Sequence, residues 1–582
     1  MSSVPRISPR WSRLAFAVPF LAFLLQPFSL PAQAPPIPER LPPDTVFYIH
    51  WHGQASLTAA SAKNHVLQLY KDPDLAPLWT GLMNAMSDKK PSQGLPPRMV
   101  LAAASSLLEN PLVVGFVTNP TLTQLTPSPR SLPSPVGFFL VYDETGKTDL
   151  IRMLASAEDA SAGAPSTVTS YDFDGTSVEV RTWKGKPTFS AHAGGYFLVS
   201  SLKRTIEGLI TRFQTSASPA ASLGQLPEYQ AIIKYIGSDT SLDFYGHLPN
   251  FSKWIPPGEK YKPLALFIQN LHLEKVHAAG EGVSFSGETT RLRGAVLGDT
   301  SPVGLFDIIG LSSPQFLTQP VIGAAQTFSI SRMDCPAMYQ LLRSAIFAAL
   351  PPGQAKSAAQ FEGLAELYLG MPIQDALGLF TGEFTSATTF SDDGTQQALY
   401  AATIQKPEDV LRILRAAFGK VTIAENASGD TTYLDLLVPM SQSPTQPKTF
   451  YYVAVTPKML LDAPSKAMLR EAIARLNSQS GAALAGGIFA DPEYIQLRSL
   501  LPAGLSSLYG YELDRIPWNK IAENVEDRLE HSQSQMQVNS QTLDLVSLLK
   551  QVNFDVISRH LHRSVGGGWK NSTGVYFDSY IQ

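Results

Sequence analysis

Cysteine and charge are both scarce in this sequence. The 582 residues include one cysteine, Cys335, which excludes an internal disulfide and a zinc site built on several thiolates. Charged residues make up 16% of the chain, against about 25% in an average soluble domain. The formal net charge is −4, and no basic run exceeds a pair such as Lys89-Lys90. A nucleic-acid partner is therefore not expected, because binding one requires a basic surface that neutralises phosphates.

Familiar catalytic and cofactor-binding patterns are also missing. The sequence contains no G-x-S-x-G elbow, no H-E-x-x-H zinc motif, no G-x-G-x-x-G turn and no EF-hand loop. Apolar stretches such as 137–142 and 345–350 are too short to span a bilayer, which takes about 20 residues. The sequence thus predicts no catalytic residue, no cofactor and no membrane span in the mature chain.

The N-terminus has the three parts of a secretory signal. Three arginines within the first 13 residues precede a short apolar run, 14–25. Residues 31–34, Pro-Ala-Gln-Ala, then place small side chains at the −3 and −1 positions of a cleavage site. We expect a signal peptide over 1–34 and a soluble protein that is periplasmic or secreted. An uncleaved anchor is the alternative, because Pro35 would follow the cut and proline hinders cleavage.

The mature part contains an internal repeat. The tripeptide Pro-Glu-Tyr occurs twice, and each time a Tyr-Gly pair and a tryptophan follow it. Three pairs of anchors share a spacing of 264 or 265 residues: Pro227 with Pro492, Tyr245 with Tyr509, and Trp254 with Trp518. This spacing predicts a tandem duplication with copies at 35–310 and 311–582, in which the paired anchors superpose.

The patterns within each copy predict an α+β fold. Asp174-Gly175 and Asp393-Gly394 are typical of two-residue turns between antiparallel strands. Apolar residues also recur at helical spacing, at Ile206, Leu209, Ile210 and Phe213 in the first copy and at Leu469, Ala472, Ile473 and Leu476 in the second. We expect each copy to form a mixed, largely antiparallel sheet with amphipathic helices on one face. A helix-prone stretch at 523–543 is an insertion in the second copy.

The start of the mature chain resembles a known group of proteins. Leu41-Pro-Pro-Asp-Thr-Val46 is followed by Lys71-Asp-Pro-Asp-Leu75 and by Leu78-Trp79. Over residues 41–80 this arrangement is similar to that of exported bacterial proteins known only as a domain of unknown function. The resemblance implies no known activity, so it assigns no functional residues.

His50-Trp51-His52 is the sharpest candidate for chemistry. Residues two apart on a strand share a face, so both imidazoles are placed to bind one metal ion. A metal site needs at least one more ligand, and no companion His-Glu pair stands out. The corresponding repeat segments lack these histidines, so we expect no further His, Asp or Glu to meet them and no metal site. His560-x-His562 has the same pattern and the same weakness.

Other short patterns have plain structural explanations. Gly146-Lys147-Thr148 lacks the glycine that a phosphate loop needs five residues earlier. Ser200-x-x-Lys203 and Ser547-x-x-Lys550 match a serine-acylase pattern that fixes only two residues. A turn or a helix surface explains each of them.

The sequence therefore favours a non-enzymatic binding or scaffolding module. Residues paired between the two copies are mostly apolar or turn-forming, and the expected partner is a protein or an apolar small molecule. Two alternatives stay open. One is a carrier of an apolar ligand sheltered between a curved sheet and its helices. The other is a hydrolase of unfamiliar type, which would need a cluster of carboxylates or histidines in one copy only.

Overall fold

The described residues form one large sheet with helices packed around it. The computed structural model describes residues 36–57, 59–78, 106–118, 136–148, 167–183, 185–214, 221–249, 261–299, 304, 308, 316–439, 448–478, 487–533 and 550–582. Every strand pairing among them is antiparallel. The predicted α+β class with an antiparallel sheet is confirmed. Residues 1–34, Trp254 and Ser547 lie outside the described residues.

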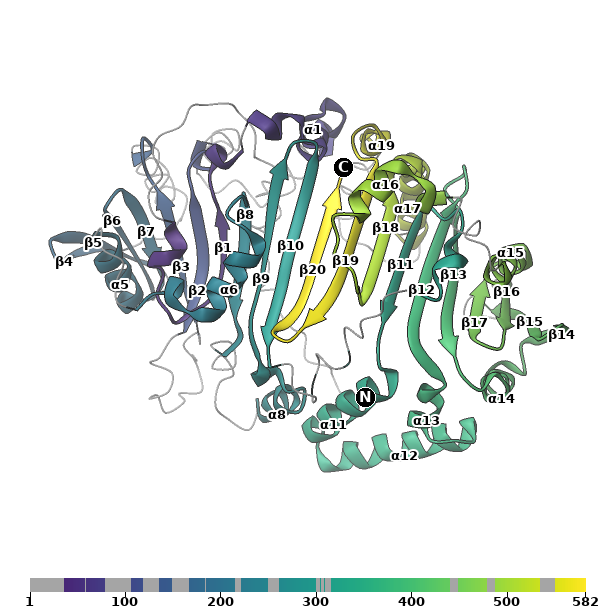
Figure 1. The fold of residues 1–582 in the computed structure, drawn as a ribbon. Helices are drawn as coiled ribbons and strands as arrows, with labels where there is room; N and C mark the ends of the chain where they lie inside the picture. The colour runs from purple at the N-terminus through teal and green to yellow at the C-terminus, as the bar shows by residue number, and fades with distance from the viewer. Residues whose placement is uncertain are drawn as a thin grey trace.

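Within the described ranges, the first half of the chain contributes ten strands to this sheet (Figure 1). Hydrogen-bonded neighbours run in the order β4-β5-β6-β7-β3-β2-β1-β8-β9-β10. The bounds are β1 Thr45–Trp51, β2 Leu112–Thr118, β3 Val136–Asp143, β4 Thr167–Phe173, β5 Thr176–Trp183, β6 Lys186–Ala193, β7 Tyr196–Ser200, β8 Leu242–His247, β9 Val276–Ser286 and β10 Thr289–Gly298.

The described part of the second half contributes ten strands in the same relative order. Its neighbours run β14-β15-β16-β17-β13-β12-β11-β18-β19-β20. The bounds are β11 Thr327–Arg332, β12 Phe380–Phe390, β13 Gln396–Ile404, β14 Thr422–Ser428, β15 Thr431–Pro439, β16 Lys448–Val455, β17 Met459–Ala463, β18 Ser507–Glu512, β19 Arg563–Asn571 and β20 Gly574–Ile581.

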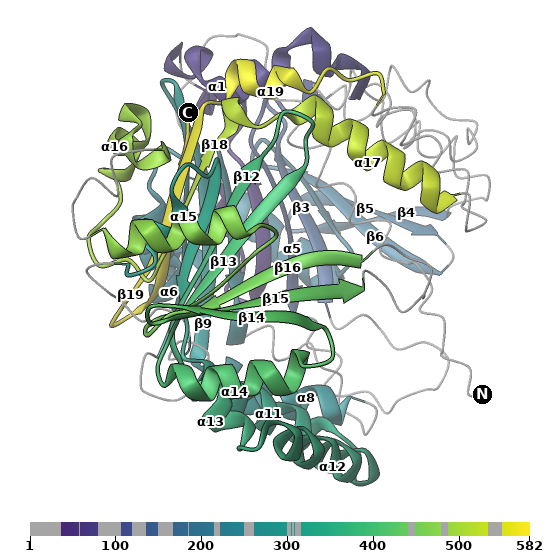
Figure 2. The same ribbon diagram turned by 90° about the vertical axis from the view of Figure 1, so that its right-hand side faces the viewer.

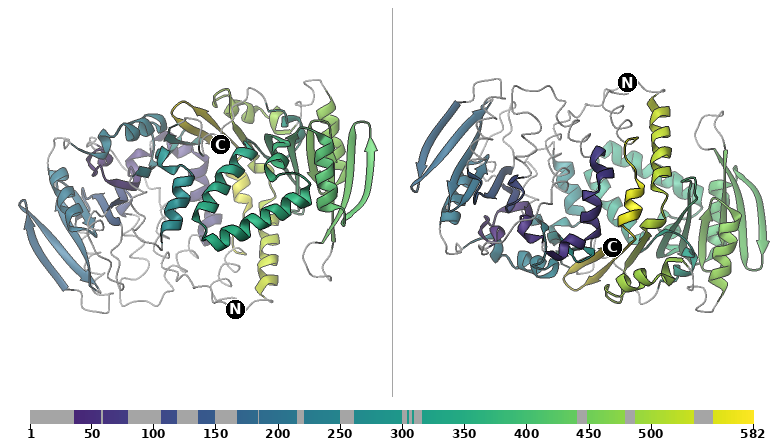
Figure 3. Two further views of the ribbon diagram at one scale, coloured as in Figure 1. Left: turned by 90° about the horizontal axis from the view of Figure 1, so that it is seen from below. Right: turned by 90° about the horizontal axis from the view of Figure 1, so that it is seen from above.

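The two halves meet at the centre of the sheet, along β10 and β20. Arg293 lies directly opposite Asp578 in this pairing. The Asp578 side chain is 6% exposed, and its carboxylate accepts hydrogen bonds from Arg291 at 2.9 Å and from Arg293 at 3.4 Å. This pairing joins the halves into one continuous sheet, with the outer hairpins of each half at opposite ends (Figure 3).

Four helices cover the convex face of the curved sheet (Figure 2). They are α5 Lys203–Gln214, α6 Pro227–Ile236, α15 Lys466–Asn477 and α16 Pro492–Arg498. The apolar stripe of α5 packs with Ile232 of α6 in one core, while α15 and α16 cover two further cores of the second half. The amphipathic stripes expected for α5 and α15 are thus buried as predicted.

The expectation that the helices share one face is wrong for α14 Pro407–Phe418. Its residues Leu411 and Leu414 pack with Leu460 on β17, whereas α15 packs with the next residue, Leu461. Neighbouring side chains on a strand point to opposite faces of a sheet. Helix α14 therefore lies on the concave face.

The remaining helices lie mainly at the two ends of the strands (Figures 1 and 2). One end carries α1 His65–Lys71, α17 Trp518–Gln533 and α19 Asp555–His560. The other end carries α8 Lys262–Asn270, α11 Cys335–Ala349, α12 Pro352–Leu369 and α13 Ile373–Gly378. The short helix α10 Gln319–Ile322 contacts α15. None of the helices in the described part of the chain is long and apolar enough to cross a membrane.

The predicted match between Tyr245 of the first half and Tyr509 of the second half is off by one residue. Tyr245 packs against Tyr229 of α6, with ring centroids 5.2 Å apart. In the second half, Gly510 takes the corresponding place against Tyr494 of α16. A Cβ added at Gly510 would lie 3.0 Å from the Tyr494 ring. A shift of one residue turns a strand side chain to the other face, so Tyr509 points away from α16.

Candidate metal centre

The side chains of β1 alternate between two buried surfaces. Trp51 points to the concave side, where its ring packs with Leu108 and its indole N–H donates to the Leu108 carbonyl at 2.7 Å. His50 and His52 point to the opposite, helix-bearing side, as the period of two requires. Strand β8 runs antiparallel beside β1 and places Asp243 directly opposite His50.

These three side chains converge on one oxygen atom. His50 Nδ1 lies 3.1 Å and His52 Nε2 lies 2.5 Å from Asp243 Oδ2. The two imidazole rings are tilted against each other with centroids 3.9 Å apart. Asp243 is 3% exposed and His52 is 27% exposed, so solvent reaches the cluster past His52. The second oxygen, Asp243 Oδ1, is buried and makes no hydrogen bond among the described residues; the buried Tyr48 hydroxyl, which interacts electrostatically with the Asp243 carboxyl group, makes none either.

Burial and charge set the protonation of this cluster. Burial favours the neutral acid, but the two histidines outweigh it and hold the pKa of Asp243 below its usual range. Burial also lowers the pKa of His50, and the neighbouring His52 adds to this, although Asp243 opposes it. Asp243 is therefore a carboxylate and His50 a neutral imidazole at neutral pH, the forms in which both side chains bind metal ions.

The expectation that no third ligand meets His50 and His52 is wrong. The ligand atoms of His50, His52 and Asp243 all lie within 4.8 Å of one another. Asp243 lies 193 residues from His50 in sequence, and only the pairing of β1 with β8 brings them together. The available signal was an acid at the second position of the strand Leu242–His247, between apolar residues, where a carboxylate is costly to bury without a partner.

The second half has no such cluster at the corresponding place. Ile330 lies opposite Leu508 in the pairing of β11 with β18, where the first half has His50 opposite Asp243. One backbone hydrogen bond in each half fixes which residues correspond. The N–H of His52 donates to Ser241 O, and the N–H of Arg332 donates to Ser506 O, both at 3.0 Å. The same strand arrangement thus forms with an apolar pair, so the fold does not require the histidine and the acid.

The spacing of the donor atoms suits a small tetrahedral ion. Zinc with ligands at about 2.0–2.1 Å keeps its ligand atoms about 3.3 Å apart. The ligand atoms here lie within 4.8 Å of one another, and the two imidazoles lie 3.1 and 2.5 Å from Asp243 Oδ2, so small shifts reach that spacing. Two imidazoles and one carboxylate suit zinc and neighbouring transition metals, whereas calcium and magnesium prefer oxygen ligands throughout. A fourth position would face the solvent side, next to His52.

The other sequence candidates have separate partners. His560 Nε2 lies 2.8 Å from Asp72, and His562 Nδ1 lies 3.8 Å from Glu493, so these histidines face different acids. The Lys147 ammonium donates to Glu109 at 2.5 Å. The Ser200 hydroxyl donates to the Phe138 carbonyl at 3.0 Å, while Lys203 lies 3.7 Å from Glu207.

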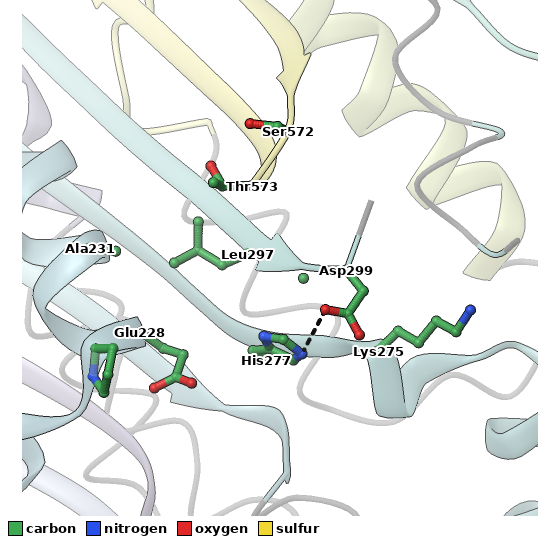
Figure 4. A pocket seen from close by; sticks show the side chains of 10 residues that line it. Glu228, Ala231, Lys275, His277, Leu297, Asp299, Ser572 and Thr573 are labelled. Carbon is green, nitrogen blue, oxygen red and sulfur yellow. Dashed lines mark ion pairs between the residues drawn. The ribbon is translucent and has the colours of Figure 1, made fainter. Parts of the chain in front are cut away.

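A wide pocket of about 700 Å³ lies where the two halves meet (Figure 4). The first turn of α6, β9, β10 and the turn between β19 and β20 line it. His277 and Asp299 form an ion pair at 3.5 Å in this pocket, and their side chains are 36% and 60% exposed. Groups this open to water hold a ligand weakly.

Comparison with protein-family models and with curated proteins gave no match. Among solved structures, crystal form I of TP0453 is similar to this chain, with 10% sequence identity and a TM-score of 0.21, over 47% of this chain and 82% of that chain. A similarity this low supports no conclusion about fold or function.

We expect the metal-free protein to lose stability through His50 as the pH falls below about 6.5, the pKa of an unfolded histidine. Because the folded-state pKa of His50 is lowered, the unfolded chain binds the proton more readily and acid favours unfolding. The double substitution His50→Ile with Asp243→Leu should flatten this dependence. Urea unfolding of both proteins with a chelator, at about pH 7.5 and 5.5, measures it. Parallel pH profiles of the free energy of unfolding for the two proteins would contradict a lowered pKa of His50 in the folded state.

Proposed function

We propose that this protein is a metal-binding module that holds one zinc ion between His50, His52 and Asp243. The observation that carries the proposal is the convergence of both imidazoles on Asp243, whose second carboxylate oxygen is buried and makes no hydrogen bond with the described residues. A bound cation would satisfy this carboxylate. The apolar pair at the corresponding place of the second half supports a functional role, since the fold forms there without such a cluster.

A hydrolase is the second candidate, and one observation favours it. The cluster supplies three protein ligands, which leaves a fourth position on the side where His52 reaches solvent. Catalytic zinc sites have this arrangement, and the open position binds water that the ion makes more acidic. The metal-binding role does not depend on this second step.

We also propose that the two halves are copies of one ancestral unit, at 35–310 and 311–582. The equal strand order of the halves supports this, as does the position of Pro227 and Pro492 at the first residue of α6 and α16. The ring contacts support it too, since Tyr48 and Phe328 hold matching places against Tyr229 and Tyr494.

The N-terminal signal leads us to propose export to the periplasm or the medium. We further propose membership of the exported group of unknown function that residues 41–80 resemble. Zinc binding through imidazole and carboxylate fits an oxidising compartment, because these ligands do not oxidise as thiolates do.

Calorimetric titration of chelator-treated protein with zinc tests the metal proposal. We expect one ion per chain for the wild type and for the control His562→Gln, whose histidine lies in the other His-x-His pattern. His52→Gln should weaken binding at least tenfold, the effect expected from losing a ligand when losing an outer contact costs about 10–100-fold. Equal binding by the wild type and His52→Gln, or no binding by the wild type, would refute the site.

A further inference from the structure

A second site lies in the other half of the molecule, on the concave face of the sheet. A pocket of about 480 Å³ opens between α14 and strands β12, β13, β15, β16 and β17. Its lining is almost entirely apolar or aromatic: Phe384, Thr385, Tyr400, Ala401, Ala402, Leu414, Phe418, Leu436, Tyr451, Val453, Leu460 and Asp462. The volume lies in the range of small-molecule sites, about 300–1,000 Å³.

The aromatic side chains of this pocket are unusually open for their size. Tyr400 is 50% exposed, and Tyr451 and Phe418 are also exposed. Tyr400 and Ala402 point to the pocket side of β13, because their neighbours Leu399 and Ala401 belong to the core under α15. The concave face here presents apolar surface that a ligand can bury.

Among the described residues, Asp462 is the one charged residue that lines the pocket. Its Oδ1 atom is buried and has no hydrogen-bond partner among the described residues. Burial raises the pKa of this carboxyl group, and a backbone hydrogen bond from Tyr400 offsets only part of that effect. A carboxylate in an apolar surround with one oxygen left without a hydrogen bond is costly, and a cation beside it removes the cost.

The first half has no acid at the place that corresponds to Asp462. Asp462 on β17 lies opposite Tyr400 on β13, and in the first half Val199 on β7 lies opposite Leu140 on β3. A valine therefore serves the same strand position, and the sheet does not need the carboxylate. The acid belongs to the pocket rather than to the fold.

We propose that this pocket binds an apolar molecule that carries one protonated amine, with the ammonium pairing with the Asp462 carboxylate and the hydrocarbon part lying against Tyr400, Tyr451 and Phe418. An ammonium both pairs with the carboxylate and is attracted to the faces of aromatic rings. This site is independent of the metal centre, which lies on the opposite face of the other half.

Three ligands of equal chain length test the proposal on the full mature chain: decylamine, decanol and decanoate, each below its micelle concentration. Displacement of a fluorescent apolar probe reports binding. The wild type should bind decylamine about tenfold more tightly than decanol, as a charge-assisted hydrogen bond predicts. It should bind decanoate the least, because two carboxylates repel.

Two variants separate the parts of the site. Asp462→Val copies the first half and should bind decylamine and decanol equally, while Ala402→Phe fills the pocket and should bind neither. Asp430→Asn changes an exposed acid in the turn between β14 and β15 and should behave as the wild type. The proposal is overturned if wild-type protein binds none of the three ligands, or if Asp462→Val keeps the preference for the amine.

Discussion

Replacing Asp578 by alanine should lower the free energy of unfolding by about 3 kcal/mol. Removing one partner of a buried ion pair costs about 3–5 kcal/mol, because the other charge is left without compensation. We expect the lower end here, since Arg291 and Arg293 are each about a quarter exposed and can turn partly to water. Asp578 is also central, as β20 lies between β10 and β19.

Urea unfolding of the variant measures this effect. The control is Asp392→Ala, an exposed acid in the turn between β12 and β13, for which we expect a change below about 0.5 kcal/mol. A comparable small change in Asp578→Ala would show that the joint between the halves rests on backbone pairing and apolar contacts alone.

Zinc should raise the free energy of unfolding of the wild type by about 4 kcal/mol at a free concentration a thousand times the dissociation constant. The ion binds the folded chain, where β1 and β8 hold the three ligands together, and the unfolded chain offers the same ligands far apart. In the double variant His50→Ile with Asp243→Leu we expect no such increase.

The same double variant provides a second readout without metal. Replacing both partners of a buried hydrogen bond by apolar residues of similar shape is often nearly neutral or stabilising, and the second half already holds Ile330 opposite Leu508. The chelator-treated variant should therefore be at least as stable as the chelator-treated wild type. A strongly destabilised variant would mean that the His50–Asp243 pair is structural, and would weaken the metal proposal.

Local elements were predictable from the sequence because their signals are local. The hairpin at Asp174-Gly175 forms with the expected two-residue turn, and Asp393-Gly394 also joins two antiparallel strands, although within a longer connection over 391–395. The helix over Ile206–Phe213 forms as expected, within α5. Each depends on residues a few positions apart, where turn geometry and helical periodicity act directly.

The position of α14 was not predictable in the same way. An amphipathic stripe says that one side of a helix is buried, but it does not say on which face of a sheet. Strand β13 has apolar side chains on both faces, Leu399 and Ala401 on one and Tyr400 and Ala402 on the other. The sheet therefore accepts a helix on either side.

Two of the three residues of the candidate metal site were predictable from the sequence. The His-x-His pattern placed two imidazoles on one strand face, since side chains alternate with a period of two. The third ligand depends on which strand lies beside β1 and in which register, and a change of one residue would turn Asp243 to the other face. The same sensitivity to a shift of one residue explains why the sequence matched Tyr509 of the second half to Tyr245 of the first.

Diffraction from crystals grown with zinc, recorded on both sides of the zinc absorption edge, tests the central claim most directly. We expect one anomalous peak about 2.0–2.2 Å from His50 Nδ1, His52 Nε2 and an oxygen of Asp243. The side chains would need to separate only slightly from their present 2.5 and 3.1 Å distances to Asp243 Oδ2. A map with no peak there, and with both histidines still hydrogen-bonded to Asp243, would contradict it.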